Sequence, residues 1–101
     1  MKLTRSMAEV LLRVEPDMST GDSVELEYTL TGPWKFTLTR EEDKYLPSKY
    51  ILMGDGGKYG TWVRRYKTME QALLHIVNRL NENRDIPNRY ATLAEWIREG
   101  D

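Results

Sequence analysis

One stretch of ten residues combines cations with aromatic rings and contains no acid. It holds four positive charges and three aromatic side chains: Lys58, Tyr59, Trp62, Arg64, Arg65, Tyr66 and Lys67. Nucleic-acid-binding proteins use such mixtures because cations contact phosphates and rings stack on bases. Protein interfaces are also enriched in Tyr, Trp and Arg. An ordinary edge strand, with its rings in the core and its cations at the edge, has the same composition. These seven residues are the candidate partner surface.

We favour a protein partner over nucleic acid for this stretch. The formal net charge of the chain is −1, so its total charge does not favour a polyanion. The basic side chains alternate between both faces of the predicted strand. No recognition helix or RNP-type motif accompanies them. The sequence therefore predicts contact with another protein or with a second copy of the chain, and nucleic acid is the alternative.

Few residues could support catalysis. His75 is the only histidine, and it lies about 140° from the centre of the apolar stripe of its predicted helix, so we expect it to face solvent. The acidic pair Glu25 and Glu27 and the acidic run at 41–43 fit solvated surfaces, since a glycosidase pair needs a concave site. No nucleophile–base motif is present. A cleft beside the loop Arg40–Ser48 nominates no reaction, and we predict no enzymatic activity.

Four glycines lie close together in the sequence G-D-G-G-K-Y-G at 54–60. The spacing differs from that of a Walker loop, and the glycines precede a predicted strand rather than a helix. A dinucleotide-binding fingerprint is excluded for the same reason. We interpret the glycines as a hairpin turn, because paired glycines supply positive φ angles. A group of backbone N–H groups that holds an anion beside Lys58 is the alternative.

Size and composition predict one soluble domain over residues 1–101. A chain of 101 residues is long enough for one hydrophobic core, and its 40% apolar and 31% charged residues are typical of globular proteins. The absence of cysteine excludes disulfides and thiolate zinc sites. No apolar run approaches the roughly 20 residues of a membrane-spanning helix. We expect a cytoplasmic protein without a cofactor, a bound metal or membrane contact.

Three capping boxes predict helices over 6–15, 69–83 and 93–99, and their cap residues are Ser6, Thr68 and Thr92. The second helix has the strongest pattern, an apolar stripe at helical spacing. The stripe consists of Met69, Ala72, Leu73, Ile76, Val77 and Leu80. In the first segment, one helical face would hold Met7, Val10, Leu11 and Val14. The segment also alternates as a strand would, so helix and strand both stay open for residues 6–15.

Four strands are predicted over 23–31, 34–40, 49–54 and 59–66. Apolar and polar residues alternate in the first two. A three-residue loop between them would pair Leu26 with Leu38 and Tyr28 with Phe36. The third and fourth strands are apolar on both faces. They are therefore either central strands covered on both sides or strands with one face open to a partner.

The element order α-β-β-β-β-α-α predicts an α+β domain. We expect a four-stranded antiparallel meander with helices packed mainly on one face. A small chain without a catalytic constellation is typical of a non-enzymatic binding module that acts through protein–protein contact. Size and motif content alone suggest, by analogy, an accessory or inhibitor protein of a phage or mobile element. A dimer would explain why two strands are apolar on both faces.

Overall fold

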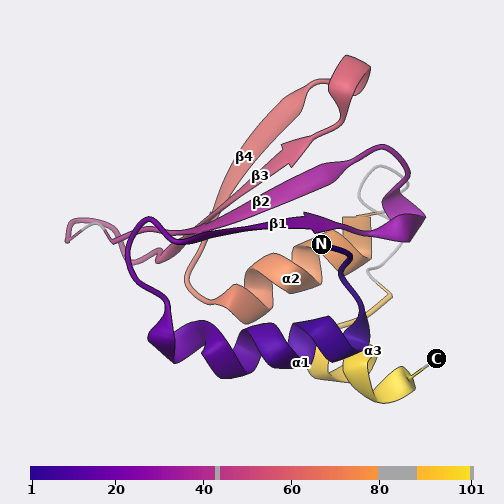
Figure 1. Cartoon of the computed structure of the whole chain (residues 1–101), viewed down its shortest axis with the longest axis horizontal. Coiled ribbons are helices and arrows are strands. Elements are labelled where there is room, and N and C mark those ends of the chain that lie inside the picture. Colours follow the sequence, from indigo (N-terminus) through magenta and orange to yellow (C-terminus); the bar gives the residue numbers. More distant parts are fainter. Residues whose placement is uncertain (43, 80–88, 101) are drawn as a thin grey trace.

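The computed structural model describes residues 1–42, 44–79 and 89–100. Its helices and strands are α1 (Arg5–Val14), β1 (Ser23–Glu27), β2 (Lys35–Arg40), β3 (Tyr50–Asp55), β4 (Thr61–Tyr66), α2 (Met69–Asn78) and α3 (Leu93–Glu99). The strands form one antiparallel sheet in the order β1-β2-β3-β4, and the helices lie on one side of it (Figure 1). The predicted α+β meander is confirmed. The predicted end of the second helix, residues 80–83, lies outside the described residues.

The helices α2 and α3 begin where the capping boxes predict. The Thr68 hydroxyl accepts a hydrogen bond from the backbone N–H of Gln71 at 3.2 Å. The Thr92 hydroxyl accepts one from the backbone N–H of Glu95 at 3.2 Å. Each bond satisfies an N–H group that has no carbonyl partner within its own helix. Gly100 follows α3 with a φ of +69°, a conformation that glycine adopts without strain.

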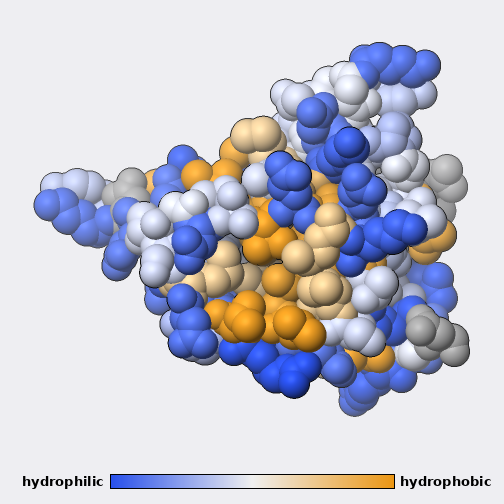
Figure 2. Space-filling view, in the orientation of Figure 1, coloured by the Kyte–Doolittle hydropathy of each residue, from blue (hydrophilic) through white to orange (hydrophobic). Residues whose placement is uncertain are grey.

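The segment at the N-terminus is a helix, but its cap differs from the prediction. The Thr4 hydroxyl accepts the backbone N–H of Met7 at 3.1 Å, so Thr4 caps α1 and the predicted cap at Ser6 is wrong. The buried side of α1 consists of Ala8 and Leu11. Val10 and Val14, which the sequence places on the same apolar stripe as Leu11, are exposed. Figure 2 shows apolar side chains gathered over α1 and the neighbouring part of β1.

The pairing of β1 with β2 differs from the prediction by two residues. Leu26 lies opposite Phe36, whereas the predicted hairpin pairs Leu26 with Leu38. The strand β1 ends at Glu27, and the connection to β2 contains a 3₁₀ turn at Thr29–Thr31. The predicted strand end at residue 31 and the predicted three-residue loop are therefore wrong. A shift of two residues keeps every side chain on its own face, so the apolar face of the hairpin is preserved.

One core lies between the sheet and the three helices. It receives the apolar face of β1, β2 and β3 together with the apolar sides of α1, α2 and α3. Its largest fully buried side chains are Leu26, Phe36, Leu38, Tyr50, Leu52, Met69, Leu73, Ile76, Leu93 and Trp96. Every residue of the stripe predicted for α2 is buried from Met69 to Val77, and its last residue, Leu80, lies outside the described residues. Because burial of each such side chain is favourable by about 1.5–3 kcal/mol, this layer holds the sheet in place.

Asn78 connects α2 to the chain that precedes α3. Its side chain is buried, its Nδ2 donates to the backbone oxygen of Tyr90 at 2.9 Å, and its Oδ1 accepts from the backbone N–H of Tyr90 at 3.1 Å. A buried amide with both ends satisfied costs little desolvation energy and fixes the position of the backbone it bonds. The C-terminal helix is thereby attached to the layer that covers the sheet.

No described helix lies over the second face of the sheet (Figure 1). Successive side chains of a strand point to opposite faces, so the residues that face away from the helices follow from the register. We call this surface the open face. Its residues are Ser23, Glu25, Glu27, Lys35, Thr37, Thr39, Ile51, Met53, Asp55, Thr61, Val63 and Arg65. Of the two arrangements that the sequence left open for β3 and β4, the described residues show the uncovered one.

Candidate functional site

The seven residues of the candidate partner surface do not form one surface. Their positions alternate along β4, which divides them between the two faces of the sheet. Trp62, Arg64 and Tyr66 lie on the face that the helices cover, and Arg65 lies on the open face. Lys58 and Tyr59 precede the strand, in a 3₁₀ turn at Gly57–Tyr59, so the predicted start of the fourth strand at residue 59 is wrong. Lys67 follows β4 and leads into α2.

Trp62 is packed among rings on the covered face. Its ring centroid lies 5.0 Å from that of His75, 6.1 Å from that of Phe36 and 6.3 Å from that of Trp34. Below the indole lies Gly54 of β3, directly opposite in the register. A Cβ on Gly54 would lie less than 3.0 Å from atoms of the indole ring. The ring therefore occupies the space that any other residue at position 54 would fill.

The glycines at 54–60 have two different structural roles. Gly57 and Gly60 have φ angles of +63° and +93°, which confirms the predicted use of glycine in the hairpin turn. Gly54 and Gly56 admit tryptophan rings instead, since a Cβ on Gly56 would lie 2.7 Å from Cζ2 of Trp34. This second role was not predicted from the sequence. The available signal was one tryptophan directly before β2 and another on β4, the two strands that flank β3.

His75 is not a surface residue, and the predicted exposure is wrong. Its ring is partly buried against β4, with centroids 5.0 Å from Trp62 and 5.8 Å from Tyr66. Burial lowers the pKa of His75 from 6.5 to about 4, and the charges of Arg64 and Arg79 add to the shift. The imidazole is therefore neutral at pH 7. The face of α2 that meets the sheet is wider than its aliphatic stripe, because β4 extends beyond the stripe and packs on His75.

Two arginines lie against the same rings. The guanidinium carbon of Arg79 is 4.6 Å from the ring centroid of Trp34 and 5.0 Å from that of Trp62. The guanidinium carbon of Arg64 is 5.8 Å from the Trp62 centroid. Burial, and then the charge of Arg64, lower the pKa of Arg79. These cation–π contacts place charge over the indole surfaces. The ring of Trp62 is thus occupied within the fold, and little of it is available for stacking on a base.

The open face has apolar side chains at its centre. Met53 is 44% exposed and Val63 is 56% exposed, and the two lie opposite each other in the register. Ile51 lies beside them on the same face and is partly exposed. At the edge of this group, Arg65 forms an ion pair with Glu41. Neighbouring exposed apolar side chains on one face of a sheet are a feature of protein–protein contact sites.

The turn between β3 and β4 presents Tyr59. The ring is 63% exposed, and Nζ of Lys58 lies 5.2 Å from its centroid. Asp55 holds the turn, because its Oδ1 accepts the backbone N–H of Gly57 at 2.9 Å. Figure 1 shows this hairpin extending away from the helical layer. The exposed ring is therefore carried on an ordered turn that projects from the body of the protein.

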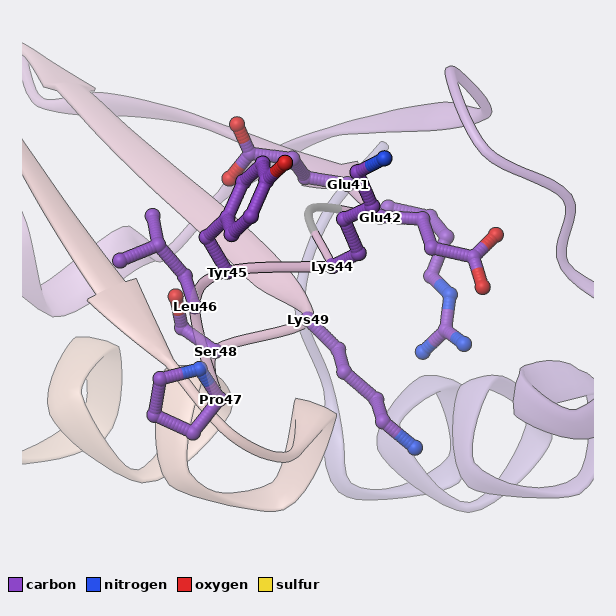
Figure 3. A pocket seen from close by; sticks show the side chains of 9 residues that line it. Glu41, Glu42, Lys44, Tyr45, Leu46, Pro47, Ser48 and Lys49 are labelled. Atoms are coloured by element: carbon purple, nitrogen blue, oxygen red, sulfur yellow. The ribbon is translucent and has the colours of Figure 1, made fainter.

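A hollow lies in the loop between β2 and β3. It has a volume of about 810 Å³ and is lined by residues of the segment 40–49. Figure 3 shows Glu42 and Lys49 pointing to one side of the loop and Leu46 and Pro47 to the other. The lining combines the hydroxyl of Ser48 with the carboxylates of Glu41 and Glu42 and the ammonium groups of Lys44 and Lys49, and the histidine of this chain lies elsewhere, on α2.

Residues 1–42, 44–79 and 89–100 contain no cluster of three or more His, Asp or Glu side chains that could hold a metal ion. None of the described helices is long and apolar enough to cross a membrane. Comparisons with protein-family models, with curated proteins and with solved structures find no match to this chain. The candidate site therefore depends on the geometry of the chain itself, namely the open face and the turn that carries Tyr59.

Proposed function

We propose that this protein is a non-enzymatic binding module that acts through protein–protein contact on the open face of its sheet. The observation that carries the proposal is the uncovered apolar group of Ile51, Met53 and Val63, which lies on a sheet whose other face holds the core. A protein surface that covers this group would remove apolar area from water, which is favourable by about 25 cal/mol per Å². Tyr59, on the adjacent turn, supplies an aromatic contact of the kind that is enriched at interfaces.

Nucleic acid fits the same surface less well. Single-strand binding needs rings that are free to stack and cations that are free to contact phosphates. Trp62 and Tyr66 are packed against His75, and Arg65 is paired with Glu41. Of the three aromatic residues in the basic stretch, Tyr59 alone is largely exposed. A titration with labelled oligonucleotides at two salt concentrations tests this alternative, since phosphate contacts predict binding that weakens steeply with salt.

The proposal is tested with two valine substitutions on different surfaces. Val63→Glu puts a charge in the centre of the open face, and Val14→Glu puts the same charge on the exposed side of α1, where Val14 is 42% exposed. Both sites are exposed, so both variants should fold. We expect Val63→Glu to lose the protein contacts that the tagged wild-type protein makes in capture and chemical cross-linking experiments, and Val14→Glu to keep them. If Val14→Glu loses these contacts and Val63→Glu keeps them, the partner binds α1 and the proposal is wrong.

A further inference from the structure

We propose that the outer edge of β4 binds an extended segment of another protein, which adds to the sheet as a further strand and carries acidic residues at its ends. This inference rests on the proposed function and names the kind of partner that reaches the open face. The strand β4 is the last in the order β1-β2-β3-β4, and among the described residues it pairs with β3 alone (Figure 1). Extended segments bind to such edges through main-chain hydrogen bonds.

The pairing of β4 with β3 shows which backbone groups of β4 face outward. Opposed residues of two antiparallel strands alternate between pairs that exchange hydrogen bonds and pairs that do not. Gly56 and Gly60 continue the register of the hairpin, and the N–H of Gly56 donates to the carbonyl of Gly60 at 2.9 Å. Bonds to β3 therefore fall at every second residue of β4, and the residues between them direct both N–H and C=O outward. These outward-facing residues are Thr61, Val63 and Arg65.

The opposite edge of the sheet makes the same kind of contact within the chain. Glu27, at the end of β1, donates its N–H to the carbonyl of Met1 at 2.8 Å, and its carbonyl accepts the N–H of Leu3 at 2.7 Å. Residues 1–3 therefore lie along the end of β1. The outward groups of β4 form no backbone hydrogen bond with a described residue. The sheet thus has one edge that the chain itself partly closes and one edge, at β4, that a partner strand would extend.

A strand added to β4 also continues the apolar group of the open face. Val63 lies on this face opposite Met53 of β3, and Ile51 lies on the same face of β3. The exposed apolar side chains are therefore on the two strands nearest to the outer edge. The residue of the added segment that pairs with Val63 places its side chain on the same face. We expect a β-branched apolar residue at this position, because such residues pack well on a pleated surface.

The charges at the two ends of β4 favour acidic ends in the segment. Lys58 precedes the strand and Lys67 follows it, and both residues are exposed. Asp55 and Glu70, the acids nearest to these lysines in the sequence, form no ion pair with them. Because one lysine lies at each end, the charge pattern is the same whichever direction the segment runs. Carboxylates near both ends of the segment would complement it.

A second copy of the chain fits this edge less well. Each copy has four cations and no acid in the stretch 58–67. The charge of Arg65 is offset by Glu41 of its own copy, but the lysines at the strand ends are not paired in this way. Antiparallel pairing of two β4 strands about Val63 would place Lys67 of one copy beside residues 58–59 of the other. Like charges would then approach each other at both ends, which is unfavourable.

The test uses a synthetic peptide of sequence E-E-V-T-V-T-V-E-E as the added segment. Fluorescence polarisation of the labelled peptide should show a dissociation constant below about 1 mM, and the affinity should fall as salt is added. The same peptide with lysines in place of its glutamates should bind at least about fivefold more weakly. Absence of binding at about 1 mM, or equal binding of the two peptides, overturns the inference.

Methylated peptides and hydrogen exchange then locate the contact on the wild-type chain. A peptide residue that pairs with Val63 directs its N–H at β4, and its neighbours direct theirs away. N-methylation of the central valine should weaken binding at least about tenfold, and that of an adjacent threonine less than about twofold. Bound peptide should slow amide exchange at Thr61, Val63 and Arg65 at least about tenfold. Equal effects of the two methyl groups, or unchanged exchange at these amides, overturn the inference.

Proline substitutions at the two edges supply a matched pair of variants. Thr61→Pro removes one outward N–H and leaves the bonds to β3 and the apolar side chains in place, because the first residue of an edge strand tolerates proline. Ser23→Pro, the control, makes the same change at the first residue of β1. Thr61→Pro should weaken peptide binding at least about tenfold, and Ser23→Pro should bind as the wild type does. Unchanged binding to Thr61→Pro overturns the inference.

The proteins captured by the tagged chain separate this inference from the proposed function. Loss of the wild-type contacts in both Val63→Glu and Thr61→Pro supports both proposals. Loss in Val63→Glu alone retains the open face as the contact site and overturns the inference. Contacts that both variants keep remove both proposals. Exchange at the outward amides that slows with rising protein concentration, without peptide, would make a second copy the occupant and would also overturn the inference.

Discussion

The two faces of β4 differ in what their side chains contact. On the covered face, Trp62 packs over a glycine and against His75, and on the open face its neighbour Val63 is 56% exposed. The two residues are adjacent in the chain and share a strand, so only the alternation of the strand separates their environments. Substitutions on the covered face should therefore change the free energy of unfolding. Substitutions on the open face should change association instead.

The largest effect on stability is expected at Gly54. Gly54→Ala introduces a Cβ within 3.0 Å of the Trp62 ring, which is held by rings on its other sides. Overpacking of this kind costs about 1–3 kcal/mol, partly offset by the better strand propensity of alanine. We expect a net loss of about 2 kcal/mol in the free energy of unfolding, measured by urea denaturation. Met53→Ala, on the open face one residue away, is the control and should cost less than about 1 kcal/mol.

Equal losses in the free energy of unfolding for Gly54→Ala and Met53→Ala would contradict the proposed difference between the covered face and the open face. The double variant Gly54→Ala with Trp62→Leu sharpens the test, because the smaller side chain leaves room for the new Cβ. We expect the cost of the alanine to fall by at least half in that background, since the two residues are in contact and their effects are not additive. A cost that stays the same would show that the Trp62 ring is not the reason for glycine at position 54.

The stability that His75 contributes on the covered face depends on pH. The pKa of His75 is about 4 in the folded protein and 6.5 in the unfolded chain, so the unfolded state binds the proton more readily. His75 therefore contributes full stability above pH 6.5, and this contribution is lost as the pH falls from 6.5 to 4. A shift of this size corresponds to about 3.4 kcal/mol at 1.36 kcal/mol per pKa unit. Because the ring is partly exposed, we expect a smaller loss of about 1–2 kcal/mol.

The measurement compares the wild type with His75→Gln, which cannot titrate in this range. Carboxylates also titrate below pH 5 in both proteins, so the informative quantity is the difference between the two unfolding free energies. That difference should change between pH 6.5 and pH 4 and become constant below pH 4. A difference that does not vary with pH would mean that His75 is exposed in solution, as its position relative to the apolar stripe of the helix predicts. The charged groups that face it are Arg64 and Arg79.

The sequence predicted the elements of this fold because their signals are local. A threonine three residues before a Gln or Glu marked the starts of α2 and α3, and both hydrogen bonds are present. The register of β1 against β2 could not be predicted in the same way. Pairing Leu26 with Leu38 or with Phe36 leaves the same residues on the apolar face, so the alternation cannot distinguish them. The choice depends on the conformation of the connection, where Thr29–Thr31 forms a 3₁₀ turn.

The candidate site was predicted less well because it depends on contacts between elements. Alternation along β4 was sufficient to show that its cations lie on both faces. It could not show that Gly54 makes room for a ring from the next strand or that His75 packs on that ring. Each of these contacts joins residues that are distant in the sequence, and periodicity carries no information about them. The open face was predicted only as one of two alternatives, since strand composition does not reveal where a helix will pack.

The smallest expected effects distinguish two adjacent arginines of β4. Arg64 lies over the Trp62 ring, so Arg64→Ala should lose about 1 kcal/mol through its cation–π contact and the packing of its stem. Arg65 forms a surface ion pair with Glu41, so Arg65→Ala should lose less than about 0.5 kcal/mol. Both values are measured by urea denaturation at low and high salt, where screening should weaken only the second. If Arg65→Ala costs as much as Arg64→Ala, the open face contributes to the stability of the monomer and the two faces of β4 do not divide stability from association.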